Sequence, residues 1–202
     1  MTASSIDPRK ERAQATRRRM VEAAYKLFSE RGWGVPLTEI AAEAGVAVQT
    51  IYFTFHTKVA LLQSALQLAV LGDELPLAPH ERPWFHAMVA EPDAAKAIGM
   101  IVENTFPIFG RVGPLTGVFR SADAEVAALW AHSEELRLDG YRKLLDAVAK
   151  KAKLKVDRKQ AVDVLFVMLS PDVYWSFVSE RGWPPDSWRR WTTEMLIQSL
   201  LR

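Results

Sequence analysis

Apolar side chains recur every three or four positions along most of this 202-residue chain, which is the period of an amphipathic α-helix. Alternation with a period of two is weak, and valine, isoleucine and threonine are scattered along the chain rather than clustered. Helices are predicted, in chain order, over 15–31, 36–43, 47–53, 58–71, 93–109, 114–121, 123–151, 157–180 and 185–201. The pattern therefore predicts an all-α fold.

Glycine, threonine and proline mark the expected ends of these helices. Gly32 and Gly45 follow the first two helices, and glycine commonly ends a helix. Thr57 has the side chain and the position of an N-cap for the helix over 58–71. The stretch GDELPLAPHERPW opens a proline-rich segment over 72–92, where we place a boundary region between a small N-terminal part and a larger body.

Charge is distributed unevenly along the chain, although the net charge is only +2. Residues 1–19 hold six Lys/Arg and two Asp/Glu, whereas the chain beyond residue 60 is nearly neutral. A basic end on a near-neutral body indicates a polyanion as the partner of that end. The alternative is a solvated tail without a partner.

Several classes of protein are disfavoured. The chain has no cysteine, which excludes disulfides and thiolate metal sites. Its four histidines are dispersed, and it has no H-E-x-x-H pair, G-x-S-x-G motif or phosphate loop, so we expect no enzyme, no metal and no cofactor. The N-terminal stretch MTASSIDPRKER has no apolar run, and the longest apolar stretch, VLFVMLS, is too short to span a bilayer. We expect a soluble cytoplasmic protein without membrane contact.

Two short helices joined by a glycine turn, LTEIAAEAG and VAVQTIYFTF, have the proportions of a helix-turn-helix. The second helix of that motif enters the major groove of DNA. Small residues allow it to approach closely, an amide can pair with adenine, and methyl groups can meet the thymine methyl. The residues that fit this role are Ala47, Val48, Gln49, Thr50 and Thr54.

The other residues of the second helix divide between the core and DNA. Ile51 and Phe55 are four positions apart and share a face, which we expect to pack inward. Tyr52 can donate a hydrogen bond to a phosphate, and Lys58 can reach another. The alternative is that the two helices merely pack together, in a helical enzyme or an interaction module.

Residues 38–62, TEIAAEAGVAVQTIYFTFHTKVALL, closely resemble the DNA-binding signature of the TetR family of bacterial transcription regulators. The preceding helix matches as well, and residues 161–191 resemble one branch of the family. The matching positions in the signature are Ile40, Ala41, Ala44, Gly45, Val46, Thr50, Tyr52, Phe55, Lys58 and Leu61.

The resemblance implies an all-helical homodimer that binds a palindromic operator in double-stranded DNA. It implies a basic arm over 1–14, a helix-turn-helix domain over 15–60, and an effector-binding and dimerisation domain over 61–202. Arg9, Lys10 and Arg12 either follow the minor groove or make only non-specific contacts. Carried over as DNA contacts are Val48, Gln49, Thr50, Tyr52, Phe53, Thr54 and Lys58, with Ala47 in place of a frequent serine.

One position departs from the family pattern. Most members have Ser or Thr before the residue that corresponds to Leu37, where it caps the helix and meets a phosphate, but this chain has Pro36 there. The cap is therefore lost, and we expect Thr38 in the first turn to take over the phosphate contact.

The helix over 157–180 is apolar on almost every side, so it needs more than one packing partner. With the helix over 185–201 it can form a four-helix interface across a twofold axis, which agrees with the family pattern. The alternative is a well-buried helix in a monomer. The expected interface residues are Val164, Val167, Met168, Trp188, Trp191 and Met195.

The body also contains enough aromatic residues to enclose an apolar or aromatic effector. The leading hypothesis is therefore a repressor that a small molecule releases from its operator. The alternative is an activator or partner-controlled regulator without an effector. Candidate effector contacts are Met100, Glu103, Asn104, Phe106, Phe109, Phe119, Trp130, Arg137, Tyr174 and Trp175.

Overall fold

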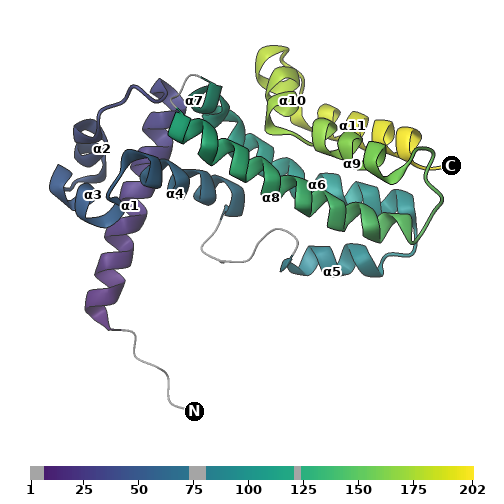
Figure 1. The fold of residues 1–202 in the computed structure, drawn as a ribbon, viewed down its shortest axis with the longest axis horizontal. Coiled ribbons are helices and arrows are strands. Elements are labelled where there is room, and N and C mark those ends of the chain that lie inside the picture. Colours follow the sequence, from purple (N-terminus) through teal and green to yellow (C-terminus); the bar gives the residue numbers. More distant parts are fainter. Residues whose placement is uncertain (1–6, 73–80, 121–123) are drawn as a thin grey trace.

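The computed structural model describes residues 7–72, 81–120 and 124–202, and every regular element in these ranges is helical (Figure 1). A single β-bridge pairs Leu154 with Leu201. The elements are α1 (Pro8–Arg31), α2 (Leu37–Ala44), α3 (Val48–Phe55), α4 (Lys58–Leu71), α5 (Pro83–Ala90), α6 (Ala94–Val112), η2 (Gly113–Leu115), α7 (Thr116–Arg120), α8 (Ala124–Ala149), α9 (Arg158–Met168), α10 (Pro171–Trp175), η3 (Ser176–Glu180) and α11 (Pro185–Leu200). The predicted all-α fold is confirmed.

Helices α1 to α4 form a small head, which lies at the left of Figure 1. Its core is built from apolar side chains at helical spacing, such as Phe28 of α1, Ile40 of α2 and Leu62 of α4, all of which are fully buried. Side chains from the corner between α6 and α7, including Leu115, join the same core. The head is therefore seated on one end of the body by apolar contacts.

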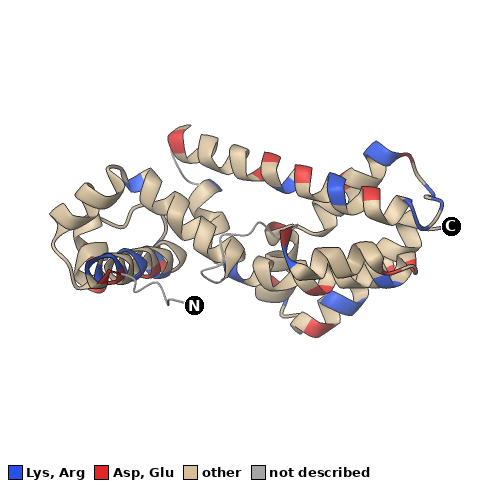
Figure 2. Cartoon of the chain, turned by 90° about the horizontal axis from the view of Figure 1, so that it is seen from below, with Lys and Arg blue, Asp and Glu red and all other residues tan. Residues whose placement is uncertain are grey.

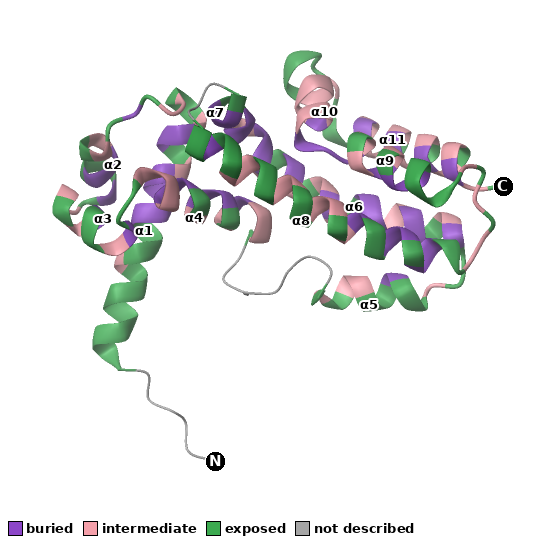
Figure 3. Ribbon diagram, viewed as in Figure 1, coloured by how far each residue is buried: buried purple, intermediate pink, exposed green. Residues whose placement is uncertain are grey.

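Helix α1 begins earlier than the sequence pattern predicts. Residues 8–14 are helical, so the prediction of a flexible arm over 1–14 is wrong for them, and residues 1–6 lie outside the described ranges. The cause is local, because Asp7 caps the helix by accepting from Arg9 N at 3.0 Å, and Pro8 stands where a missing N–H costs nothing. The first turns of α1 are exposed and project beyond the head (Figure 3).

The body is a helical layer in which α6 packs against α11 and α8 packs against α9. Its core is separate from the core of the head and includes Ile101 of α6, Leu145 of α8, Leu165 of α9 and Trp188 of α11. Helix α4 contacts both α1 and α6 and so connects the two parts. The expected domain boundary between residues 60 and 61 falls inside this helix, whose buried face belongs largely to the head.

Two elements differ from the predicted pattern. The proline-rich segment over 72–92 contains a helix, α5, which starts at Pro83 and packs on α6. The single helix predicted over 157–180 is broken after Met168, because Pro171 cannot donate a backbone hydrogen bond within a helix. Ser170 caps the next helix by accepting from Val173 N at 3.2 Å.

No single helix within the described ranges is long and apolar enough to cross a membrane, although the bent pair formed by Arg158–Met168 and Pro171–Glu180 has sufficient length and apolar content.

Candidate nucleic-acid interface and effector site

Helices α2 and α3 meet at a tight glycine turn. Gly45 adopts a left-handed conformation, with φ of 66° and ψ of 41°, which costs a residue without a β-carbon little. Its N–H donates to Ala42 O at 3.1 Å, and Val46 N donates to Ala41 O at 3.0 Å, so the last carbonyls of α2 are satisfied. The turn fixes the direction of α3 relative to α2.

Helix α3 has one buried side and one side open to solvent. Ile51 and Phe55 are buried in the core of the head, as predicted. Tyr52 and Phe53 are 53% and 85% exposed. Large aromatic side chains are usually buried at least in part. Their exposure here indicates a surface that meets another molecule.

The remaining candidate DNA contacts lie around the same exposed side. Thr38, Ala47 and Gln49 are exposed, while Val48 and Thr50 are half-buried. Val48 also packs against the core of the head, so only part of its side chain can reach a base. These roles in binding DNA stay predictions.

The hydroxyl of Thr54 is already engaged within α3. It donates to the carbonyl of Thr50 at 2.7 Å, a bond that turns the hydroxyl back along the helix. A contact with a base would therefore use the methyl group of Thr54 or the remaining lone pairs of its oxygen.

The N-termini of α2 and α3 lack side-chain caps. Pro36 and Ala47 stand at these N-cap positions, and neither offers a side-chain hydrogen bond, which confirms the loss of the cap expected at Pro36. Uncapped helix N-termini present backbone N–H groups and a positive end of the helix dipole, both of which favour a phosphate. By contrast, Thr57 caps α4 by accepting from Ala60 N at 3.0 Å, as predicted.

Lys58 makes contacts within the head that the sequence did not predict. Its ammonium donates to the carbonyl of Trp33 and lies 4.4 Å from the centre of the Trp33 indole. Trp33 in turn stacks on Phe28. A phosphate contact by Lys58 would have to share or exchange these interactions, so the lysine also braces the loop between α1 and α2.

Positive charge in the head follows α1 rather than α3. Helix α3 contains no charged residue, whereas Lys and Arg line α1 beside the N-terminal end of the described chain (Figure 2). Arg17 of α1 lies over the Phe55 ring at 4.4 Å and donates to Ser64 at 3.2 Å. The head therefore pairs a neutral helix suited to base edges with a basic helix suited to phosphates.

The ten candidate effector contacts do not gather around one cavity. Phe119 and Trp130 stack at 4.5 Å on the head side of the molecule, whereas Phe109 and Tyr174 pack with Trp188 in the body core. Trp175 covers Gly113, where an added Cβ would lie 2.7 Å from the indole. Met100 and Phe106 are half-buried beside the body core. These aromatic residues mainly form core, and their contact with an effector stays a prediction.

Arg137 has a structural role at the break after α9. Its guanidinium donates to the carbonyls of Phe166 and Leu169 at 2.7 and 3.1 Å and pairs with Glu134 at 2.7 Å. The Tyr141 hydroxyl also donates to Leu169 O, and burial raises the pKa of Tyr141 to about 12. These bonds satisfy the carbonyls that the broken helix leaves open.

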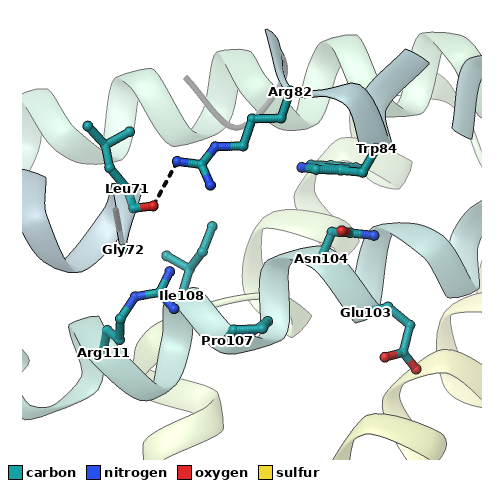
Figure 4. Close-up of a pocket in the computed structure, with 9 residues that line it drawn as sticks. All are labelled: Leu71, Gly72, Arg82, Trp84, Glu103, Asn104, Pro107, Ile108 and Arg111. Atoms are coloured by element: carbon teal, nitrogen blue, oxygen red, sulfur yellow. Dashed lines mark hydrogen bonds between the residues drawn. The ribbon is translucent and has the colours of Figure 1, made fainter. Parts of the chain in front are cut away.

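A hollow of about 220 Å³ opens between α4, α5 and α6 (Figure 4). Of the ten candidates, Glu103 and Asn104 line it. The sequence analysis missed its other side chains, because they come from three segments that only the fold brings together. Among the described residues, the lining consists of Leu71, Gly72, Arg82, Trp84, Glu103, Asn104, Pro107, Ile108 and Arg111.

The geometry of the head agrees with a known family. Residues 20–65 match the sequence model of the bacterial regulatory proteins of the tetR family. The head therefore contains a TetR-type DNA-binding domain, in which α2 and α3 are the helix-turn-helix. The curated relatives of this part of the chain are named HTH-type transcriptional regulators.

Two curated relatives share part of the chain. It is 36% identical over 86 residues to the HTH-type transcriptional regulator SrpR of Pseudomonas putida. The aligned residues cover 41% of this chain and 40% of SrpR. It is 37% identical over 88 residues to the uncharacterized HTH-type transcriptional regulator TtgW of the same species. The aligned residues cover 41% of this chain and 64% of TtgW. The matches thus span less than two thirds of either relative.

The fold of the whole chain is also found in solved structures. That of the transcriptional regulator FadR from Bacillus subtilis in complex with stearoyl-CoA superimposes with a TM-score of 0.70 over 89% of this chain and 97% of that one. The two sequences are 17% identical, so this likeness concerns the fold.

The body has an apolar groove of about 430 Å³ on its α9 and α11 face. It is lined by Asp163, Val164, Val167, Met168, Met195 and Ser199, which include four of the six residues predicted at the dimer interface. Val167, one of these lining residues, is 56% exposed. Trp191 lies elsewhere on α11, tilted against Phe177 at 5.1 Å.

Trp188 does not belong to this groove, and its predicted place in the dimer interface is wrong. It is 0% exposed within its own chain, where its ring meets Phe109 at 5.9 Å and Tyr174 at 5.0 Å. The sequence pattern placed Trp188 and Trp191 together because both are aromatic. Helical geometry puts residues three apart on similar sides, and only the position of α6 decides which of them is covered.

Proposed function

We propose that this TetR-family regulator binds a palindromic operator as a homodimer and represses transcription until a small-molecule effector releases it. The observation that carries the proposal is α3, a charge-free helix whose Tyr52 and Phe53 stand exposed while Ile51 and Phe55 hold it on the core. Such a helix suits the major groove, where base edges and methyl groups are read without net charge. The proposed place of action is the cytoplasm.

Dimerisation is supported by the apolar groove between α9 and α11. Contact between water and the valine and methionine side chains on one face of a helix pair is unfavourable in free energy. A second copy that covers this face would remove that apolar surface from water. If the twofold axis at this face runs along the length of the body, the two heads lie at the same end of the pair, as a palindromic operator requires.

Release by a small molecule is supported by the hollow between α4, α5 and α6. The hollow adjoins α4, the helix that continues directly from the head into the body. The fold neighbour FadR holds stearoyl-CoA, so a fold of this kind accommodates a small molecule. An effector that prefers one arrangement of α4 would shift the arrangement of the heads.

The first experiment is selection of bound duplexes from a random DNA pool at physiological salt. We expect a palindrome whose half-sites lie about one or two helical turns apart, each turn being roughly 34–36 Å. The affinity of the selected duplex is then measured between low and high salt. Enrichment of no sequence, together with binding that is lost steeply with salt, would mean that the head contacts only the phosphate backbone, and it would contradict the proposal.

A further inference from the structure

We infer that Arg17 of α1 binds a phosphate of the DNA backbone beside α3, and that Phe55 and Ser64 hold its guanidinium in place for this contact. The contact presupposes the proposed function, because it belongs to the same DNA-binding surface.

Arg17 lies where three helices of the head meet. Its guanidinium carbon lies over the Phe55 ring at the end of α3, 4.4 Å from the ring centre. Its Nη2 donates to Ser64 Oγ of α4 at 3.2 Å. Phe55 is buried, whereas Arg17 is exposed. The guanidinium therefore touches α3 on one side and solvent on the other.

The charge of Arg17 has no carboxylate partner within the described part of the chain. Further along α1, Lys26 pairs with Glu43 at 2.7 Å, and Arg31 pairs with Glu39. A guanidinium has five N–H donors, and in the described residues Arg17 uses one of them, toward a neutral hydroxyl. Its charge and most of its donors are therefore available to an anion outside the chain.

Phe55 and Ser64 fix the guanidinium before DNA binds. A guanidinium that stacks on an aromatic ring keeps the N–H groups at its edge available. The hydroxyl of Ser64 is oriented as well, because it donates to Ala60 O at 3.1 Å. A long side chain that is already ordered loses less freedom on binding than one that moves in water. Arg17 is therefore suited to one oriented contact, and phosphate oxygens accept from a guanidinium in pairs.

Arg17 lies at the flank of the surface proposed to read base edges. Tyr52 is three residues before Phe55, so the two side chains lie on neighbouring sides of α3, and Tyr52 is 53% exposed. Helix α3 has no charged residue of its own. The phosphates on either side of its base contacts must therefore be met by other elements of the head. Arg17 supplies a cation that is in contact with α3 itself, on the helix that Figure 2 shows to be rich in Lys and Arg.

The alternative is that Arg17 only covers Phe55. A cation over an aromatic ring stabilises a folded head whether or not DNA is bound. The two roles differ in how duplex binding depends on salt, because only a charge that neutralises a phosphate releases counterions from DNA. The salt dependence of binding therefore separates them.

Arg17→Gln is the principal variant, because it removes the charge and keeps a polar side chain. We expect its affinity for the selected duplex at physiological salt to fall roughly tenfold. We also expect the slope of log affinity against log salt concentration to become shallower by about 0.9, the contribution of one phosphate contact. Fluorescence anisotropy at several salt concentrations measures both quantities. A slope equal to that of the unaltered chain would overturn the phosphate contact, whatever the affinity does.

Arg19→Gln is the matched control. Arg19 is an exposed residue of the same helix, and two residues of an α-helix are about 200° apart, so it points to the other side of α1 from Arg17. This variant loses the same charge, and we expect it to keep the slope of the unaltered chain. An equal change of slope in both variants would mean that only the total charge of α1 counts, and it would refute the assignment to Arg17.

Two further variants separate the charge of Arg17 from its placement. Arg17→Lys keeps the charge without the planar guanidinium, so we expect an unaltered slope and a smaller loss of affinity than in Arg17→Gln. Ser64→Ala keeps the arginine but removes the hydroxyl that orients it. We expect an unaltered slope and a roughly threefold loss of affinity. If Ser64→Ala binds the duplex as tightly as the unaltered chain does, the part assigned to Ser64 is wrong.

Circular dichroism melting confirms that each variant folds. A preparation that is partly unfolded lowers the apparent affinity by about the same factor at every salt concentration, so it does not imitate a change of slope.

The same titrations with a duplex of random sequence separate this contact from the proposed function. If no sequence is selected from the pool, the proposed operator fails, and the slopes of Arg17→Gln and Arg19→Gln on the random duplex still decide the phosphate contact. If a sequence is selected and Arg17→Gln keeps the full slope, the contact fails and the operator stands. If neither duplex is bound at all, both are refuted.

Discussion

At the scale of single residues, Phe53 and Phe55 show how the fold divides identical side chains. They are two positions apart on α3, and a helix of 3.6 residues per turn points them to opposite sides. Phe55 is buried beneath the guanidinium of Arg17, whereas Phe53 is almost wholly in water. The first therefore serves stability, and the second is available for recognition.

Replacing each phenylalanine by alanine separates these roles. Phe55→Ala is expected to lower the free energy of unfolding by about 3–5 kcal/mol, because it opens a cavity in the core of the head. Phe53→Ala is expected to change it by less than about 0.5 kcal/mol but to weaken binding of the selected duplex roughly tenfold, or 1.4 kcal/mol. Urea denaturation measures the former and fluorescence anisotropy the latter. Unchanged duplex affinity in Phe53→Ala would remove this residue from the interface.

At the scale of elements, α1 is the clearest departure from the predicted pattern. Its first turns carry Arg9, Lys10 and Arg12 in a helix capped by Asp7, rather than in a flexible arm. A helical segment that projects from the head offers its cations in a fixed direction. It therefore suits the phosphates that flank the major-groove site.

Replacing Arg9, Lys10 and Arg12 by glutamine is expected to weaken duplex binding without changing the selected sequence. Each lost phosphate contact removes about 0.9 from the slope of log affinity against log salt concentration, so the slope falls by roughly 1 to 3. The measurement is a salt titration of duplex binding by fluorescence anisotropy.

The matched control for the α1 variant removes three exposed lysines from the body, in Lys143→Gln, Lys150→Gln and Lys159→Gln together. This protein loses the same net charge at the other end of the molecule. We expect its salt slope to stay as in the unaltered chain. A slope that changes equally in both variants would mean that only the total charge counts and that α1 has no particular contact with DNA.

At the scale of the whole molecule, the head and the body are joined through α4 and the corner between α6 and α7. The core of the head includes side chains of the body, such as Leu115 and Val118, so a change in the position of the head requires these contacts to rearrange. The α9 and α11 groove lies on the body face, away from α3. A dimer formed there leaves both recognition helices accessible.

Val167→Glu tests this arrangement. A carboxylate in the groove would be buried at the dimer interface without a cationic partner, so we expect the dimer dissociation constant to rise by about 100-fold or more. Sedimentation velocity measures the change, and duplex affinity is expected to fall with it. Leu136→Glu on α8, a position that is 63% exposed outside the groove, is expected to leave the dimer intact. A Val167→Glu protein that remains dimeric would move the interface elsewhere.

The sequence by itself determined the features that rest on local interactions. The 3.6-residue period predicted the helices of the head and most of those of the body. The left-handed Gly45 and the capping Thr57 act within one turn of chain, so α2, α3 and the start of α4 were predictable to within about two residues. The opposite roles of Ile51 and Tyr52 follow from the same local geometry.

Only the tertiary structure decided what depends on contacts between distant segments. Trp188 and Trp191 look alike in the sequence, yet the packing of α6 covers one of them completely. Arg82 and Arg111 carry no local signal, because the carbonyls that they hold belong to another helix. Burial and hydrogen bonding at such positions are set by the approach of separate elements, and Arg111 and Ala69, for example, are 42 residues apart in the chain.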